Sequence, residues 1–138
     1  MREPLSGMFN RLLGLMIDML FVSVGACAGA TLRYVISRSI PAVDGFPTGT
    51  LIVNFIGSLI IGLVMYLSVF RGFFTREDRL LIVTGFCGSL TTFSTFAYET
   101  FSLIQEGLWY LAILNIVTNV VLCTLGVYLG KIIASLLT

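Results

Sequence analysis

Three asparagines stand inside long apolar stretches of this sequence, where their amide groups could bind a small ion. Asn54 lies in one stretch, and Asn115 and Asn119 lie in another. Residues four apart share one face of a helix, so Asn115 and Asn119 form one polar stripe. If these stretches cross a membrane, polar side chains in them are costly and need partners or a purpose. Each amide is therefore either an interhelical hydrogen-bonding group or a donor facing a polar path.

The sharpest feature is the run from Thr84 to Thr95, TGFCGSLTTFST, which combines two glycines with several hydroxyl side chains. Glycine and β-branched residues are poor helix formers. Serine and threonine hydroxyls can replace backbone partners where a helix breaks. An unwound turn here would expose carbonyl groups that can hold a cation. The alternative is a face of small residues for close helix packing.

Phe93 and Phe96 lie three residues apart, on nearly one helix face, with Glu99 one turn further on. A phenylalanine ring has a positive edge, which attracts a small anion without a full charge; otherwise these rings face lipid or the core. Arg33 ends an apolar segment, where it either snorkels to the interface or concentrates anions at a pore mouth. Glu99 either snorkels likewise, accepts a hydrogen bond or is protonated. Together the uncharged donors suit a small, strongly hydrated anion that is passed along quickly.

The composition indicates a membrane protein. Of the 138 residues, 57% are apolar and 11% are charged, against about 25% charged in an ordinary soluble domain. This excludes a disordered chain, a nucleic-acid binder and most soluble enzymes. The chain contains no histidine, which removes the commonest general base and metal ligand. A phosphate-binding glycine loop is also absent, and the three cysteines lack metal-site spacing, so we expect neither an enzyme nor an ATP-driven pump.

Four apolar segments are long enough to cross a membrane. They run from about Met19 to Ile36, Leu51 to Phe70, Leu80 to Ile104 and Leu108 to Leu137. The connections between them are a loop at Ser39–Thr48, a charged stretch that follows Arg71 and contains Thr75 as a helix N-cap, and a turn at Gln105–Gly107. The sequence therefore predicts an all-α integral membrane protein with four transmembrane helices.

Residues 1–18 are distinct, because charged residues such as Asp18 are mixed with leucines. They form an interfacial segment, part of a longer first helix, or an upstream extension, ahead of a four-helix domain at 19–138. Four helices put both termini on one side. That side holds six of the eight cations: Arg2, Arg11, Arg71, Arg76, Arg79 and Lys131, against Arg33 and Arg38 on the other. The positive-inside rule then favours cytoplasmic termini.

At these residues the chain resembles the small bacterial fluoride channels, the Fluc or CrcB family. Three motifs carry the resemblance: GATLRY at 29–34, GTLIVN at 49–54, and GFCGSLTTFSTF at 85–96 followed by Glu99. Their order and spacing fit the family from about Met19 to the C-terminus. Four positions depart from the family pattern, two of them, Asn115 and Asn119, in the last segment. Ala97 stands where a serine is common, and Ser89 replaces the second glycine of a pair.

The resemblance implies a subunit with a broken third helix that forms an antiparallel, dual-topology dimer with two fluoride pores. It also implies a sodium ion at the dimer centre, held by the backbone carbonyls of Gly88 and Thr91. The residues that it assigns to the pore are Asn54, the aromatic pair Phe93 and Phe96, and a polar track of Ser94, Thr95 and Glu99, with Arg33 in the vestibule. Asn115 and Asn119 stand where the family often carries an aromatic or histidine and then a serine.

The resulting expectation is a passive fluoride channel that exports F⁻ across the bacterial cytoplasmic (inner) membrane. The dimer is either a homodimer or a pair with an oppositely oriented paralogue. Two other readings stay open. One is a small proton-coupled exporter of the multidrug type, which needs a membrane carboxylate, for which Asp18 is the nearest candidate. The other is a scaffold subunit that transports nothing.

Overall fold

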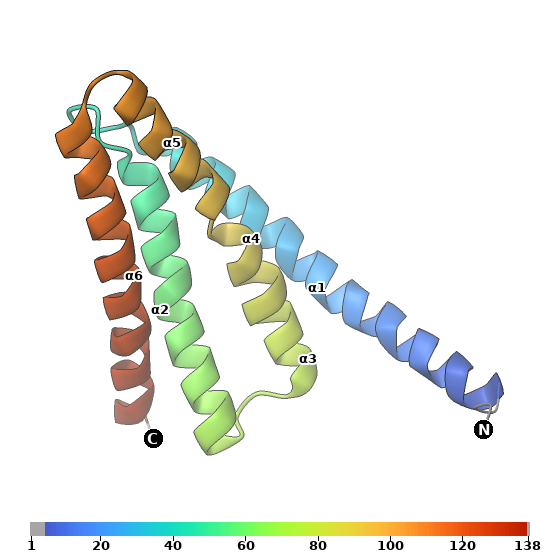
Figure 1. Cartoon of the computed structure of the whole chain (residues 1–138). Helices are drawn as coiled ribbons and strands as arrows, with labels where there is room; N and C mark the ends of the chain where they lie inside the picture. The colour runs from blue at the N-terminus through green and yellow to red at the C-terminus, as the bar shows by residue number, and fades with distance from the viewer. Residues whose placement is uncertain (1–4, 138) are drawn as a thin grey trace.

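The computed structural model describes residues 5–137, and Figure 1 shows that long helices make up the chain. Its elements are α1 (Leu5–Ser39), α2 (Thr48–Arg71), α3 (Arg76–Arg79), the π-helix η1 (Leu80–Cys87), α4 (Gly88–Leu90), α5 (Phe93–Gln105) and α6 (Trp109–Leu136). Four stretches are long and apolar enough to cross a membrane: α1, α2, the run from α3 to α5 (the third span), and α6. The predicted all-α membrane protein with four spanning segments is confirmed.

Helix α1 begins at Leu5, well before the predicted start at Met19. A longer first helix, one of the alternatives for residues 1–18, is observed for the described residues from Leu5 onward. Both carboxylate oxygens of Asp18 accept hydrogen bonds from the guanidinium of Arg76, one of them at 2.8 Å. This ion pair offsets the charge of Asp18 within the helix. The predicted domain boundary between residues 18 and 19 stays a prediction, and Arg2 lies outside the described residues.

Helices α2 and α6 pack side by side along their length, as Figure 1 shows. Two glycines permit this close approach. A Cβ atom at Gly62 would collide with the Val127 carbonyl oxygen, and one at Gly130 would collide with the Leu59 carbonyl oxygen. The two backbones therefore touch where side chains would normally separate them, which fixes the α2–α6 pair as a close-packed unit.

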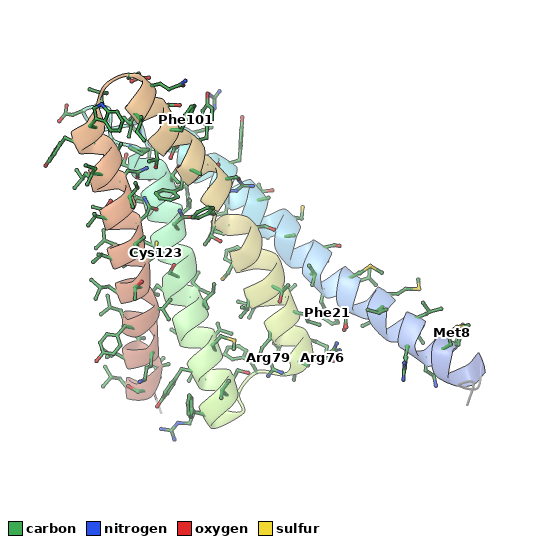
Figure 2. All side chains as sticks on the ribbon, viewed as in Figure 1. Met8, Phe21, Arg76, Arg79, Phe101 and Cys123 are labelled. Carbon is green, nitrogen blue, oxygen red and sulfur yellow. The ribbon has the colours of Figure 1, made fainter. Side chains whose placement is uncertain are left out.

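The third span packs against α1 in a similar way, through Gly29 of α1, whose added Cβ would meet the Phe86 carbonyl oxygen. The span begins with the predicted N-cap. Thr75 and Asp78 form a reciprocal capping box, in which each side chain accepts a hydrogen bond from the other residue's backbone N–H. Figure 2 shows Arg76 and Arg79 at this start, and Arg79 donates to Ser68 Oγ of α2 at 2.7 Å.

The third span is interrupted at Thr91 and Thr92, which are extended with ψ values of 153° and 105°. Helix α4 stops before them and α5 begins after them. The side chain of Thr92 caps the new helix by accepting from the Thr95 backbone N–H at 3.3 Å. The broken third helix is therefore present in the backbone, at the hydroxyl-rich run that predicted it.

Candidate functional site

The interruption leaves backbone groups without helical partners, and Asn54 of α2 supplies one. The backbone N–H of Thr92 donates to Asn54 Oδ1 at 2.7 Å. In a continuous helix this N–H would donate to the carbonyl oxygen of Gly88, four residues earlier. Unwound backbone at membrane depth requires such substitutes, because lipid offers no hydrogen bonds. The side chain of Asn54 thus joins α2 to the break.

The three asparagines are linked in a chain. Asn54 Nδ2 donates to Asn119 Oδ1 at 3.1 Å. Asn119 Nδ2 donates to Asn115 Oδ1 at 2.9 Å and to the Asn115 carbonyl oxygen at 3.1 Å. Asn115 Nδ2 donates to Thr100 Oγ1 at 2.9 Å. Asn119 keeps 6% of its surface exposed and Asn115 none, so Asn115 lies behind its neighbours.

A cavity of about 300 Å³ opens beside Asn54 and the break. We name it the central cavity. Its lining residues are Asn54, Ser58, Ile61, Thr91, Thr92, Phe93, Phe96, Asn119, Val120 and Cys123. None of these ten side chains is charged. The cavity is thus lined by amide, hydroxyl and aromatic groups together with Ile61, Val120 and the thiol of Cys123. It can hold a small ion only through dipoles and ring edges.

Two phenylalanine rings form part of the central cavity wall. The ring centroids of Phe93 and Phe96 are 5.5 Å apart and the rings are tilted by 53°. Phe96 is buried, whereas Phe93 has 78% of its surface exposed on this single chain. The structure therefore brings the predicted aromatic pair to the same cavity as Asn54 and Asn119.

Ser58 and Cys123 also line the central cavity, and sequence reasoning did not single them out. A signal was present, because each lies one turn beyond a predicted residue: Ser58 follows Asn54 by four positions, and Cys123 follows Asn119 by four. Figure 2 labels Cys123 on α6. Of the three cysteines, Cys87 is buried, Cys123 is half-buried and Cys27 is exposed on the single chain.

Arg33 lies in a separate hollow of about 260 Å³, which Thr92 and Thr95 also line. Its Nε is buried and makes no hydrogen bond. The hydroxyls of Thr92 and Thr95 are 2.9 Å apart, and that of Ser94 lies 3.4 Å from Thr92 Oγ1. Thr92 lines both this hollow and the central cavity. The break therefore lies between a hollow lined by a charged side chain, Arg33, and a cavity lined by none.

Glu99 lies in a third hollow, of about 360 Å³, at the end of α2 nearer the 40–47 loop. Its Oε1 accepts from Thr50 Oγ1 at 2.7 Å, while its Oε2 is buried and accepts no hydrogen bond. Ser37 lines this hollow and the Arg33 hollow. The predicted polar residues are thus divided: Asn54 and Asn119 line the central cavity, Arg33 and Thr95 a second hollow, and Glu99 a third. Ser94 and Asn115 line none of the three.

Backbone oxygens near the break are the groups suited to a metal. Among the described residues, no cluster of three or more histidine, cysteine, aspartate or glutamate side chains could hold one. The ordinary helical partners of the Gly88 and Thr91 carbonyls are the N–H groups of Thr92 and Thr95, and both of these donate to side chains instead. Carbonyl oxygens are suitable ligands for hard cations.

Sequence comparison gives this arrangement a family. Residues 20–131 match the family model described as "CrcB-like protein, Camphor Resistance (CrcB)". A relative from Methanocaldococcus jannaschii named fluoride-specific ion channel FluC is 53% identical over 117 residues, covering 85% of this chain and 94% of its own. The proteins with the same name from Methanococcus vannielii and Pyrococcus furiosus are 50% and 46% identical, over 87% and 85% of this chain and 98% and 95% of their own. The chain therefore belongs to the CrcB family.

Proposed function

We propose that this chain forms a passive fluoride-selective channel, not an enzyme, in the cytoplasmic membrane. Relatives with this name cover most of the chain, and four helices can span the bilayer. The observation that carries the proposal is the central cavity, whose lining holds amide, hydroxyl and aromatic groups but no charge. Uncharged donors bind a small anion strongly enough to admit it and weakly enough to release it.

In the proposed path, fluoride passes Asn54, Asn119 and the two phenylalanine rings in the central cavity. Arg33, with Ser94 and Thr95 nearby, forms a vestibule that raises the local anion concentration. Glu99 extends the polar track, with its bonded oxygen held by Thr50. Asn115 belongs to the path through its bond to Asn119, since its side chain has no exposed surface.

Two subunits complete the path. Phe93 and Tyr98 have 78% and 71% of their surface exposed on one chain, so α5 has surface that is free to contact a partner. We propose an antiparallel homodimer with two pores. Single cysteines placed in the 40–47 loop and in the 72–75 loop test this topology. An antiparallel dimer labels each loop from both sides of the membrane, whereas one-sided labelling would indicate a paralogous partner or a parallel pair.

A sodium ion at the dimer centre is the proposed cofactor. The carbonyls of Gly88 and Thr91 fit it, because both lack their helical donor, and Gly88 is exposed on the single chain. Bound there, sodium would supply a fixed positive charge beside the unwound backbone. Replacing sodium with N-methylglucamine should lower the thermal midpoint of the purified dimer. An unchanged midpoint at every sodium concentration would remove sodium from the proposal.

Fluoride efflux from liposomes tests the function. The protein is reconstituted in liposomes loaded with equal amounts of potassium fluoride and potassium chloride. Valinomycin is added to let potassium leave, and the efflux of each anion is followed with an electrode selective for it. We expect rapid fluoride efflux and no chloride efflux. Absence of fluoride efflux from a folded, sodium-supplied dimer would contradict a fluoride channel and favour the scaffold reading.

The exporter reading loses its main support, because a proton-coupled carrier needs a carboxylate that is free to exchange its proton. Both oxygens of Asp18 are occupied by the Arg76 guanidinium. Transport of hydrophobic cations that depends on Asp18 would restore that reading.

A further inference from the structure

We propose that Asn119, Asn115 and Thr100 are positioning residues that fix the direction of the Asn54 amide, so that among the three asparagines Asn54 alone donates into the central cavity. This inference rests on the proposed fluoride channel. It concerns which of the polar groups contact the ion and which act through another residue.

The direction of the chain follows from its first member. A backbone N–H can only donate, so the Thr92 N–H requires an acceptor from Asn54. Asn54 therefore presents Oδ1 to the break at 2.7 Å and turns its NH₂ group toward Asn119. An NH₂ group can only donate, so Asn119 must in turn present its oxygen. The backbone N–H at the break thus decides that the oxygen of the Asn54 amide, not its nitrogen, faces the break.

The same logic continues to the last member. Asn119 turns its NH₂ toward Asn115, which turns its own NH₂ toward Thr100 Oγ1. The Thr100 hydroxyl then donates to the Phe96 carbonyl oxygen at 2.8 Å. A carbonyl can only accept, so the chain begins on a group that must donate and ends on one that must accept. Every link runs in one direction, an arrangement in which hydrogen bonds reinforce one another.

This direction leaves the asparagines unequal toward an anion. Both amide hydrogens of Asn119 have acceptors on Asn115, at 2.9 and 3.1 Å. Asn119 therefore turns its oxygen, not its hydrogens, toward Asn54 beside the cavity. Asn54 uses one hydrogen on Asn119, and its second has only a long contact of 3.5 Å to the Thr92 carbonyl. That second hydrogen is the amide donor left for fluoride.

Both ends of the chain lie on the segment that forms the cavity wall. Thr92 and Phe96 line the central cavity, and the chain between them passes through α2 and α6 before it returns to α5. Loss of the Thr100 hydroxyl, outside the cavity lining, should therefore disturb ion recognition at Asn54.

The first test compares threonine variants in the reconstituted channel. Thr100→Val removes the hydroxyl with little change of shape, and Thr100→Ser restores it. The matched control is Thr124→Val, because Thr124 donates to the carbonyl four residues earlier at 2.7 Å but belongs to no chain. We expect Thr100→Val to raise the half-saturating fluoride concentration roughly three- to tenfold, the value of one hydrogen bond, with rescue by serine and no change in the control. Equal half-saturation in Thr100→Val and Thr124→Val would overturn the inference.

The second test needs no variant, so misfolding cannot obscure it. The chain contains four asparagines, Asn10, Asn54, Asn115 and Asn119, so selective ¹⁵N-asparagine labelling gives four side-chain NH₂ groups, each with two proton signals. Titration with sodium fluoride at constant sodium should shift one Asn54 amide proton most and leave Asn10 unchanged. A larger shift at Asn119 or Asn115 would make that residue an ion ligand and overturn the inference.

The two proposals fail in different ways. If the wild-type channel carries no fluoride, the proposed function fails, and the inference that rests on it fails as well. If the wild type conducts fluoride but the threonine variants behave alike, the function stands and the positioning role is wrong.

Discussion

The third span and α6 differ in the regularity of their backbones. Helix α6 is one uninterrupted helix of 28 residues, whereas the third span is divided among α3, η1, α4 and α5. Yet α6 carries two buried asparagines, whereas the third span contains the extended backbone at Thr91 and Thr92. A regular helix can therefore carry polar side chains that form hydrogen bonds with an irregular neighbour. Asn115 of α6 donates to Thr100 of α5, and Asn119 accepts from Asn54, which bonds the break.

The α2–α6 pair and the break in the third span also differ in what holds them in place. The α2–α6 pair is fixed by backbone contact at Gly62 and Gly130. The break is held by hydrogen bonds that come from that pair through Asn54. Rigid packing on one side therefore supports an unwound segment on the other, and variants on each side should have different effects.

The largest effect is expected at Asn54, where α2 contacts the break in the third span. Asn54→Asp removes the amide hydrogens and places a negative charge beside the anion path. Two like charges 4 Å apart repel by about 4 kcal/mol at an effective dielectric of 20, so we expect roughly a thousandfold loss of fluoride flux. Asn10→Asp, far from the break in α1, is the control, and efflux from liposomes is the measurement. Unchanged flux in a folded Asn54→Asp dimer would exclude Asn54 from the path.

A change in the α2–α6 pair should affect the stability of the protein instead of its selectivity for fluoride. Gly130→Ala puts a methyl group against the Leu59 carbonyl, and overpacking of this kind costs about 1–3 kcal/mol. Gly14→Ala meets nothing within 4 Å, so it should be neutral or stabilising by helix propensity. Thermal unfolding followed by circular dichroism in detergent compares the two. Equal midpoints would mean that α2 and α6 are not in backbone contact.

A smaller effect is expected from the aromatic edge. Phe93→Ile keeps an apolar side chain but removes the ring and its positive edge. Such contacts contribute about 0.5–1.5 kcal/mol, so fluoride flux should fall by at most about tenfold. Phe73→Ile changes another exposed ring, in the loop after α2, and should leave flux unchanged. Equal flux in the two variants would assign Phe93 to lipid contact only.

The smallest effect is expected from the exposed ion pair between Asp18 and Arg76, at the start of the third span. Asp18→Asn removes the charge that pairs with Arg76, whose side chain is 61% exposed. Exposed pairs contribute little, so fluoride flux should be unchanged and the thermal midpoint should move only slightly. A loss of transport in Asp18→Asn would instead indicate that this carboxylate participates in transport, as in an exporter.

Local features were predictable from the sequence. Thr75 was recognisable as an N-cap because capping depends on neighbouring residues. The poor helix formers between Thr84 and Thr95 indicated a break, with a close-packing face as the alternative, and the break lies within that run, at Thr91 and Thr92. The start of α1 stayed open among three alternatives, because the partner of Asp18, Arg76, lies 58 positions later in the chain.

The candidate site divides along the same line. That Asn115 and Asn119 share a face follows from their spacing. The bond from Asn54 to Asn119 joins residues 65 positions apart, and only the packing of α2 on α6 brings them together. For the same reason, spacing alone could not tell that Asn115 is covered, or that Arg33 and Glu99 lie in hollows of their own.

The most direct test of passive fluoride conduction is whether efflux requires charge compensation. Liposomes containing the channel and potassium fluoride are diluted into fluoride-free medium, and valinomycin is added to let potassium leave. A passive channel carries net charge, so fluoride should stay inside until valinomycin is added and then leave rapidly, while chloride stays inside in parallel liposomes. Full fluoride efflux before valinomycin would indicate electroneutral exchange and contradict the account.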